Sequence, residues 1–424
     1  MRFLAKNQCL GVLLLGVSGS AWAEGVLPVP RDVVAPSEYD TEDFVPGFYP
    51  SLGLAYQHSS NPRRGDGDVV SDTAWVITPA LRYHQPVGRR NQLLLDYVGS
   101  YTYFSDLDDE NSQDHRLGAN LFLDLTSRFD LNLGADYTKG HDTRGLSDSR
   151  LTEVADTELD RWRQNGFHVE GVFGRPAAKG QIRAGYAHSR LRFVNNDQET
   201  RDRDMDTFNL AFFYSHSPKT KLFVEGRFWQ IDYIEAEQAG LDLSSEETSL
   251  AFGATWQATA RTKGHAQVGF TRKNPDAVGA ESFDGLTFSG RIVWARTSYS
   301  NIGLFYTRNL EEPTELDASY IVADTYGADW NHAFTERFSM NLWTRFGVNE
   351  FSNDREDELT DWGLNLGYRV ADWLSLGAGY SQLKRESTTP DGDFTDRVFT
   401  LSLQIQGAHE GSRTSQRNEA EAAP

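Results

Sequence analysis

Apolar and polar positions alternate along almost the whole chain. From Pro46 to Gln406, segments of about ten to fourteen residues place apolar side chains at every second position and polar or small ones between them, and each segment ends in a turn. The segment 117–125 has leucine or alanine at every odd position, and 131–138, 361–369 and 399–406 alternate in the same way. A period of two is the signature of a β-strand with one apolar and one polar face. The pattern therefore predicts an all-β chain.

The connectors between these segments fall into two classes that take turns along the chain. We expect short connectors at 85–91, 126–128, 174–180, 217–220, 260–264, 295–298, 332–336 and 370–373. We expect longer connectors, most of them acidic, at 59–72, 105–113, 141–161, 195–203, 236–245, 274–281, 309–317, 350–358 and 386–393. Eight short and nine longer connectors predict about 18 strands, within a range of 16–18. An even number of strands returns both ends of the chain to one side.

Short turns on one side, longer loops on the other and an even number of such strands are typical of bacterial outer-membrane barrels. A soluble β-sandwich would alternate in the same way. Two further observations favour the barrel. Apolar positions near strand centres carry no charge, as lipid contact requires when a central Arg or Lys costs about 2–4 kcal/mol. Aromatic residues such as Tyr83, Trp229, Trp256, Trp294 and Trp373 gather at strand ends, as in the girdles at membrane interfaces. We therefore expect a transmembrane up-and-down antiparallel β-barrel over 46–406.

The polar face of the strands would then line a lumen. Charged residues occupy it at Asp96, Asp124, Asp136, Glu170, Arg183, Glu225, Arg291, Arg345, Asp361 and Arg369, and we predict that these residues line the pore. Eighteen tilted strands close a cylinder roughly 35 Å across, which side chains alone do not fill. The loop 141–161 and the segment 24–45 are the candidates for a constriction that would select solutes by charge. For the loop, an outward, solvated position is the alternative.

One residue conflicts with its predicted strand. Pro79 lies inside the segment 72–84, and proline has no N–H to donate to a sheet. We expect either a β-bulge at this position or a shorter strand.

The two ends of the chain indicate export. Residues 1–23 contain Arg2 and Lys6, then the apolar run 10–17, then Ala21-Trp22-Ala23, which predicts a signal peptide cleaved before Glu24. Residues 24–45 contain three prolines and predict an extended periplasmic leader. The small, polar residues 407–424 predict a disordered tail. After residue 23 no apolar run approaches the roughly 18 residues of a membrane-spanning helix.

Charge and composition exclude several classes of function. Lys and Arg number 41 against 61 Asp and Glu, a net charge of −20, which argues against a nucleic-acid partner. The one cysteine lies in the predicted signal peptide, so the mature chain has no disulfide or cysteine nucleophile. No H-E-x-x-H pair, G-x-S-x-G motif or glycine-rich phosphate loop occurs. We expect neither catalysis nor a metal or cofactor, although a hydrolase triad assembled from separate strands leaves no trace in sequence spacing.

Three segments resemble a known family: YPSLGLAYQHSSNPRRGDG at 49–67, LGYRVADWLSLGAGYSQ at 366–382 and DRVFTLSLQIQ at 396–406. They are similar to the Putative beta-barrel porin 2 family, and the likeness covers roughly 46–406. The resemblance implies an outer-membrane barrel, often encoded with exopolysaccharide or capsule biosynthesis genes. The chain departs from the usual pattern at its end, since polar residues follow Ile405-Gln406 where outer-membrane strands usually finish on an aromatic residue.

These observations predict an outer-membrane, porin-like channel that passes saccharides or other polar solutes. The lumenal face combines charges and amides with rings such as Phe122, Phe305 and Trp343, and sugars offer hydroxyls and CH faces to such groups. The expected partners are membrane lipid, lipopolysaccharide and a saccharide, with a periplasmic polysaccharide-secretion protein as a further candidate. The alternative function is a scaffold barrel without an open pore, in which 24–45 or 407–424 docks that periplasmic partner.

Overall fold

The structure is a computed structural model, and it describes residues 46–67, 69–145, 158–175, 178–235, 242–313 and 317–407. Its sheet has 18 strands. The first nine are β1 (Gly47–Ser59), β2 (Asp72–Val87), β3 (Asn91–Phe104), β4 (Ser112–Thr126), β5 (Phe129–His141), β6 (Arg161–Phe173), β7 (Gly180–Phe193), β8 (Arg203–Ser217) and β9 (Thr220–Tyr233). The others are β10 (Ser245–Thr259), β11 (Thr262–Pro275), β12 (Phe283–Thr297), β13 (Ser300–Glu311), β14 (Ile321–Ala333), β15 (Phe338–Phe351), β16 (Glu356–Ala371), β17 (Leu374–Ser387) and β18 (Phe394–Gln406).

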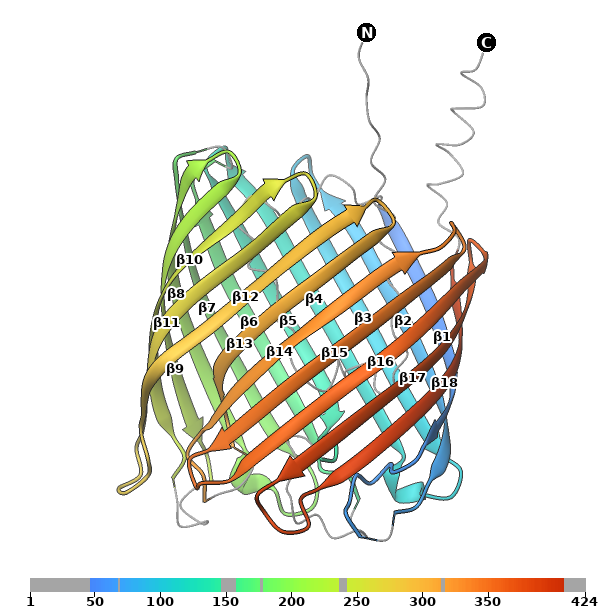
Figure 1. Ribbon diagram of the computed structural model, residues 1–424. Coiled ribbons are helices and arrows are strands. Elements are labelled where there is room, and N and C mark those ends of the chain that lie inside the picture. The colour runs from blue at the N-terminus through green and yellow to red at the C-terminus, as the bar shows by residue number, and fades with distance from the viewer. Residues whose placement is uncertain are drawn as a thin grey trace, which may run out of the picture.

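The sheet closes on itself (Figure 1). Each strand pairs antiparallel with its neighbours in the sequence, and β1 also pairs with β18, from Ser51 opposite Gln406 to Ser59 opposite Val398. Closure leaves no strand with a free edge, which is the condition for a β-sheet to span a bilayer. The predicted fold class and strand number are confirmed.

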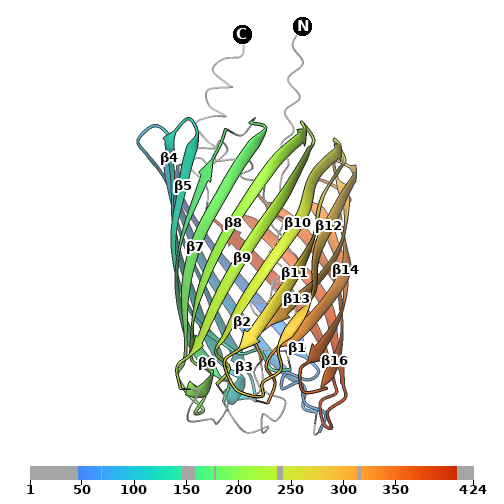
Figure 2. The ribbon, with the colours of Figure 1, turned by 90° about the vertical axis from the view of Figure 1, so that its left-hand side faces the viewer.

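The two ends of the barrel differ in the length of their connectors. Tight turns such as 88–90 and 218–219 join strands at one end, where β1 begins and β18 finishes (Figure 1). The other end has the longer connectors, and two of these contain short 3-10 helices, η2 (Asp108–Glu110) and η3 (Glu199–Arg201) (Figure 2). By the usual rule for such barrels, the short turns lie in the periplasm and the longer loops lie outside the cell.

Exposure alternates along the strands, as a barrel requires. In β8, Phe208, Leu210 and Phe212 are 49%, 60% and 45% exposed, whereas Ala211 and Phe213 are 1% exposed. The exposed apolar positions of neighbouring strands are paired in register, for example Phe212 with Ile182 of β7. The outer face is therefore a continuous apolar belt, and the opposite face of each strand points into the lumen.

The expectation for Pro79 is wrong. Strand β2 runs through Pro79 and continues to Val87, beyond the predicted end at 84. The ladder to β3 pairs Ile77 with Tyr101 and then Ala80 with Val98, so two pairs are missing but the register does not shift. Gly99 faces the gap, and a Cβ there would lie 3.3 Å from Pro79 Cγ. The missing side chain makes room for the proline ring without a bulge.

The predicted segments at the ends of the chain are only partly covered. The signal peptide 1–23, the leader 24–45 and the tail after Gly407 lie outside the described residues. Across the ranges that the structure covers, no helix has the length and apolar character needed to cross a membrane.

Candidate functional site in the barrel lumen

All ten predicted pore-lining residues lie on the lumenal face. They fall in β3, β4, β5, β6, β7, β9, β12, β15 and β16, each at a position of opposite parity to the exposed apolar side chains of its strand. In β16, for example, Trp362, Tyr368 and Val370 are exposed on the outside, while Asp361 and Arg369 alternate with them. That these residues line an open pathway stays a prediction.

Three of the ten meet in one network with Arg227. Arg183 Nη2 lies 3.1 Å from Glu225 Oε1, and Arg183 Nε lies 3.7 Å from Glu170 Oε2. Arg227 Nη2 lies 2.7 Å from the other oxygen of Glu225, whose side chain is 3% exposed. We call Glu170, Arg183, Glu225 and Arg227 the charged cluster. Its two acids and two bases cancel in net charge, so the cluster makes this part of the wall polar but close to neutral.

Three more of the ten form simple ion pairs across the wall. Arg345 and Asp361 approach to 3.6 Å, and Arg291 Nη2 lies 2.6 Å from Asp329 Oδ1. Asp329 was not predicted.

The others stay apart from one another. Asp124 lies 3.5 Å from Arg90 beside a short turn. Asp96 lies over Gly118 and Asp136 lies over Gly166, where a glycine Cβ would come within 2.6 Å of a carboxylate oxygen in each case. Arg369 donates to the backbone carbonyl of Glu336. The ten residues are therefore spread around the lumen instead of forming one site.

A ladder of asparagines lies on the other side of the barrel. The register pairs Asn301 of β13 with Asn331 of β14, Asn331 with Asn341 of β15, and Asn341 with Asn365 of β16. Asn331 Nδ2 donates to Asn301 Oδ1 at 3.2 Å, and Asn341 Nδ2 donates to Asn331 Oδ1 at 2.9 Å. We call these four residues the asparagine ladder. Each is a polar position in an alternating segment, but only the register shows that they are neighbours.

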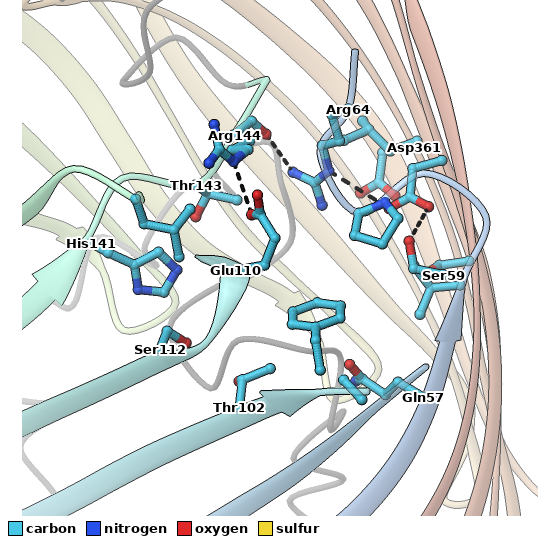
Figure 3. Close-up of a pocket in the computed structure, with 18 of the residues that line it drawn as sticks. Gln57, Ser59, Arg64, Thr102, Glu110, Ser112, His141, Thr143, Arg144 and Asp361 are labelled. Atoms are coloured by element: carbon cyan, nitrogen blue, oxygen red, sulfur yellow. Dashed lines mark hydrogen bonds and ion pairs between the residues drawn. The ribbon is translucent and has the colours of Figure 1, made fainter. Parts of the chain in front are cut away.

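A pocket of about 160 Å³ lies in the lumen at the end with the longer loops (Figure 3). Its lining comes from strands at both ends of the chain, and includes Gln57 of β1, Thr102 of β3 and Asp361 of β16. Arg144 Nε donates to Glu110 Oε2 at 2.9 Å, and Arg64 donates to the Arg144 carbonyl at 3.0 Å (Figure 3). We call this cavity the outer pocket.

Burial shifts the pKa of one carboxyl group at the outer pocket. Glu110 lies in η2, outside the strands, and burial raises the pKa of its carboxyl, while the nearby Arg144 and Arg63 act in the opposite direction. Arg144 belongs to the predicted constriction loop 141–161, and His141, Thr143 and Arg144 all line the pocket. The described start of this loop therefore lies within the outer end of the lumen, whereas 146–157 lies outside the described residues.

Metal-ligating side chains do not gather in this lumen: in the part of the chain that the structure describes, no three His, Cys, Asp or Glu residues come together as a metal site would require.

Comparison with known families identifies the architecture. The family model described as Putative beta-barrel porin 2 matches residues 44–407. The chain belongs to the Putative beta-barrel porin 2 family. This membership, together with the closed barrel of 18 strands and its apolar belt, identifies a porin-like protein of the outer membrane.

Solved structures of outer-membrane proteins resemble this porin-family member. OccK2 (OpdF) of Pseudomonas aeruginosa is 14% identical, with a TM-score of 0.48 over 87% of this chain and 99% of that one. The outer membrane protein opdK of the same organism is 12% identical, with a TM-score of 0.48 over 85% and 99%. A BenF-like porin from Pseudomonas fluorescens Pf-5 is 10% identical, with a TM-score of 0.48 over 85% and 99%. No curated protein matches the sequence.

Proposed function

We propose that this porin-family barrel is a passive channel for saccharides or similar uncharged polar solutes. The asparagine ladder is the observation that carries the proposal. It presents amide groups in register on four adjacent strands, β13 to β16, all facing the lumen. An amide both donates and accepts hydrogen bonds, as a sugar hydroxyl does, so a row of amides can exchange partners with a sugar moving past it.

The electrostatics of the wall support an uncharged solute. The described cations among the predicted pore-lining residues each have an acceptor: Arg183 and Arg291 pair with carboxylates, Arg345 approaches Asp361, and Arg369 binds a carbonyl. Charges that neutralise one another at short range produce little net field in water. A wall of this kind offers contacts to hydroxyl groups without a strong preference for one sign of ion.

Flux through reconstituted protein tests the proposal. The mature barrel in a planar bilayer should conduct salt, and a maltooligosaccharide series should block that current in a concentration-dependent way. The double variant Asn331→Leu with Asn341→Leu should weaken the block by about thirtyfold, because each of the two lost hydrogen bonds is worth about 1 kcal/mol. Asn209→Leu is the matched control, since Asn209 faces the lumen from β8, outside the ladder, opposite Gly185.

The outcomes separate the channel from its alternatives. A sealed bilayer without current would contradict the channel and favour the scaffold barrel. Equal weakening of block in the ladder variant and in Asn209→Leu would contradict the role of the asparagine ladder. A link to exopolysaccharide export rests on the family resemblance alone. It is tested by comparing the amount of polysaccharide secreted by a strain that lacks this protein with the amount secreted by its parent strain.

A further inference from the structure

The outer face of the barrel changes from apolar to basic at the edge of its apolar belt nearest the longer loops. Toward the loops, the outward face of each of the strands β5, β6 and β7 passes from an aliphatic to an aromatic residue. The pairs are Leu133 and Tyr137 on β5, Val169 and Phe167 on β6, and Ile182 and Tyr186 on β7. Aromatic residues at this level mark the interface between hydrocarbon and headgroups. Nearer the loops each strand carries an outward base: Lys139 follows Tyr137 directly, Arg163 lies beyond Asn165, and Arg190 lies beyond His188.

The register places these bases side by side. Lys139 is paired with Arg163 across β5 and β6, and Arg163 is paired with Arg192 across β6 and β7. Arg190 lies two residues before Arg192 on the same face, opposite Asn165. We call Lys139, Arg163, Arg190 and Arg192 the basic patch, and its strands β5, β6 and β7 are on the left in Figure 2. Like charges directly opposite each other destabilise a sheet unless something neutralises them.

Carboxylates neutralise only one side of the patch. Asp204 of β8 binds both Arg190, at 3.0 Å, and Arg192, at 2.7 Å. Lys139 and Arg163 form no ion pair with any residue that the structure describes, and Arg163 is exposed. The patch therefore keeps a net positive charge on a protein whose formal charge is −20.

Three outward bases elsewhere at this level have an acid opposite or beside them, whereas Arg397 of β18 lies opposite Gln382 and donates to its amide oxygen at 3.2 Å. Arg272 of β11 is paired in register with Asp284 of β12 and binds it at 2.7 Å. Arg308 of β13 is paired in register with Asp324 of β14 and binds it as well. Lys384 lies 2.8 Å from Glu386. The arrangement at β5 to β7 differs from these sites because two bases, Lys139 and Arg163, lie directly opposite each other on neighbouring strands.

We propose that the basic patch binds the phosphate groups of lipopolysaccharide in the outer leaflet. Arg and Lys donate charge-assisted hydrogen bonds to phosphate oxygens, and Arg does so with two parallel donors. Three adjacent strands span roughly 10 Å, which suits a headgroup with more than one phosphate better than a single phosphate. The acyl chains of such a lipid would lie along the apolar belt directly below, over Phe167 and Val169, which are 44% and 38% exposed.

Binding of lipopolysaccharide to the purified full barrel in detergent tests the proposal. The variant Lys139→Gln with Arg163→Gln should bind lipopolysaccharide about tenfold or more weakly than the wild type, because it loses two charge-assisted contacts. The matched control is Arg272→Gln with Arg308→Gln, which removes two outward bases at the same level and should leave the affinity within about twofold. The heat-dependent shift in gel migration of folded barrels verifies that both variants fold.

Further ligands distinguish the sources of phosphate. Dephosphorylated lipopolysaccharide, phosphatidylglycerol vesicles and inorganic phosphate should each bind the wild type about tenfold or more weakly than intact lipopolysaccharide. Equal binding of phosphatidylglycerol would overturn the assignment to lipopolysaccharide. Equal loss in the patch and control variants, or no loss in the patch variant, would overturn the site itself. These results are independent of salt or sugar flux, so they stand apart from the proposed channel.

Discussion

The charged cluster and the asparagine ladder are two ways of building one lumenal wall. Both consist of inward positions on neighbouring strands, and both are held by side-chain contacts across the sheet. In the charged cluster, Glu225 is almost fully buried, and each of its two oxygens accepts a hydrogen bond from an arginine. In the asparagine ladder, each amide keeps donors and acceptors beyond its bonds to neighbours. The comparison indicates that the ion pairs of the charged cluster stabilise the wall, whereas the amides of the asparagine ladder can also form hydrogen bonds with a solute.

The largest effect should come from removing the centre of the charged cluster. Glu225→Gln removes the buried carboxylate that Arg183 and Arg227 share, and it leaves Arg183, whose side chain is 13% exposed, with only Glu170 at 3.7 Å. The variant should lower the free energy of unfolding by about 3 kcal/mol. Urea unfolding of the barrel in detergent measures this value. Glu170→Gln is the control, because Glu170 is 20% exposed and 3.7 Å from Arg183, and it should cost less than about 1 kcal/mol. Equal losses in both variants would contradict the central role of Glu225.

A smaller effect should follow from placing a charge in the ladder. Asn331→Asp adds a carboxylate next to Asp329, and a unit charge about 5 Å away in water is worth roughly 0.8 kcal/mol, so cation preference should rise about fourfold. The reversal potential across a salt gradient measures the change. Asn331→Gln is the control, because it keeps a neutral amide at the same position and should leave the potential nearly unchanged. An unchanged potential in Asn331→Asp would show that the ladder lies outside the ion path.

The smallest effect should be a pH dependence at the outer pocket. Burial raises the pKa of Glu110, so the packed loop favours the protonated carboxyl. This contribution to stability is complete below the unfolded pKa of about 4.3 and is lost as the pH rises through the higher folded value. Protease cleavage of the loop segment around Arg144 should therefore become faster between pH 4 and pH 8.

The variant Glu110→Gln should remove most of that change, because its side chain stays neutral. Asp109→Asn alters a neighbouring acid whose partner is Arg63 and serves as the control. A pH dependence that persists undiminished in Glu110→Gln would assign the titration to another group.

The barrel architecture could be predicted from the sequence because two of the features that determine it are visible in short segments of the chain. Alternation at 117–125 and 361–369 identifies strands and their inner face, and the contrast between turns such as 126–128 and loops such as 141–161 identifies the two ends. The asparagine ladder was not readable, because a shift of two residues in the pairing would keep Asn331 and Asn341 on the inner face but place other residues opposite them. The outer pocket was hidden for a related reason: Ser59 binds Asp396 across 337 residues of sequence. The bulge or shorter strand predicted at Pro79 was wrong because Gly99, which makes room for the proline ring, lies on the next strand.

The pairing of β1 with β18 determines the order in which this barrel can assemble. In a closed barrel every strand must be paired on both sides, and the last pairing forms only when the final strand meets the first. A chain that stops before Phe394 is an open sheet with two unpaired edges, and in hydrocarbon each unsatisfied backbone group costs several kcal/mol. The first strand synthesised must therefore be kept from other partners until translation and export of the whole chain are complete.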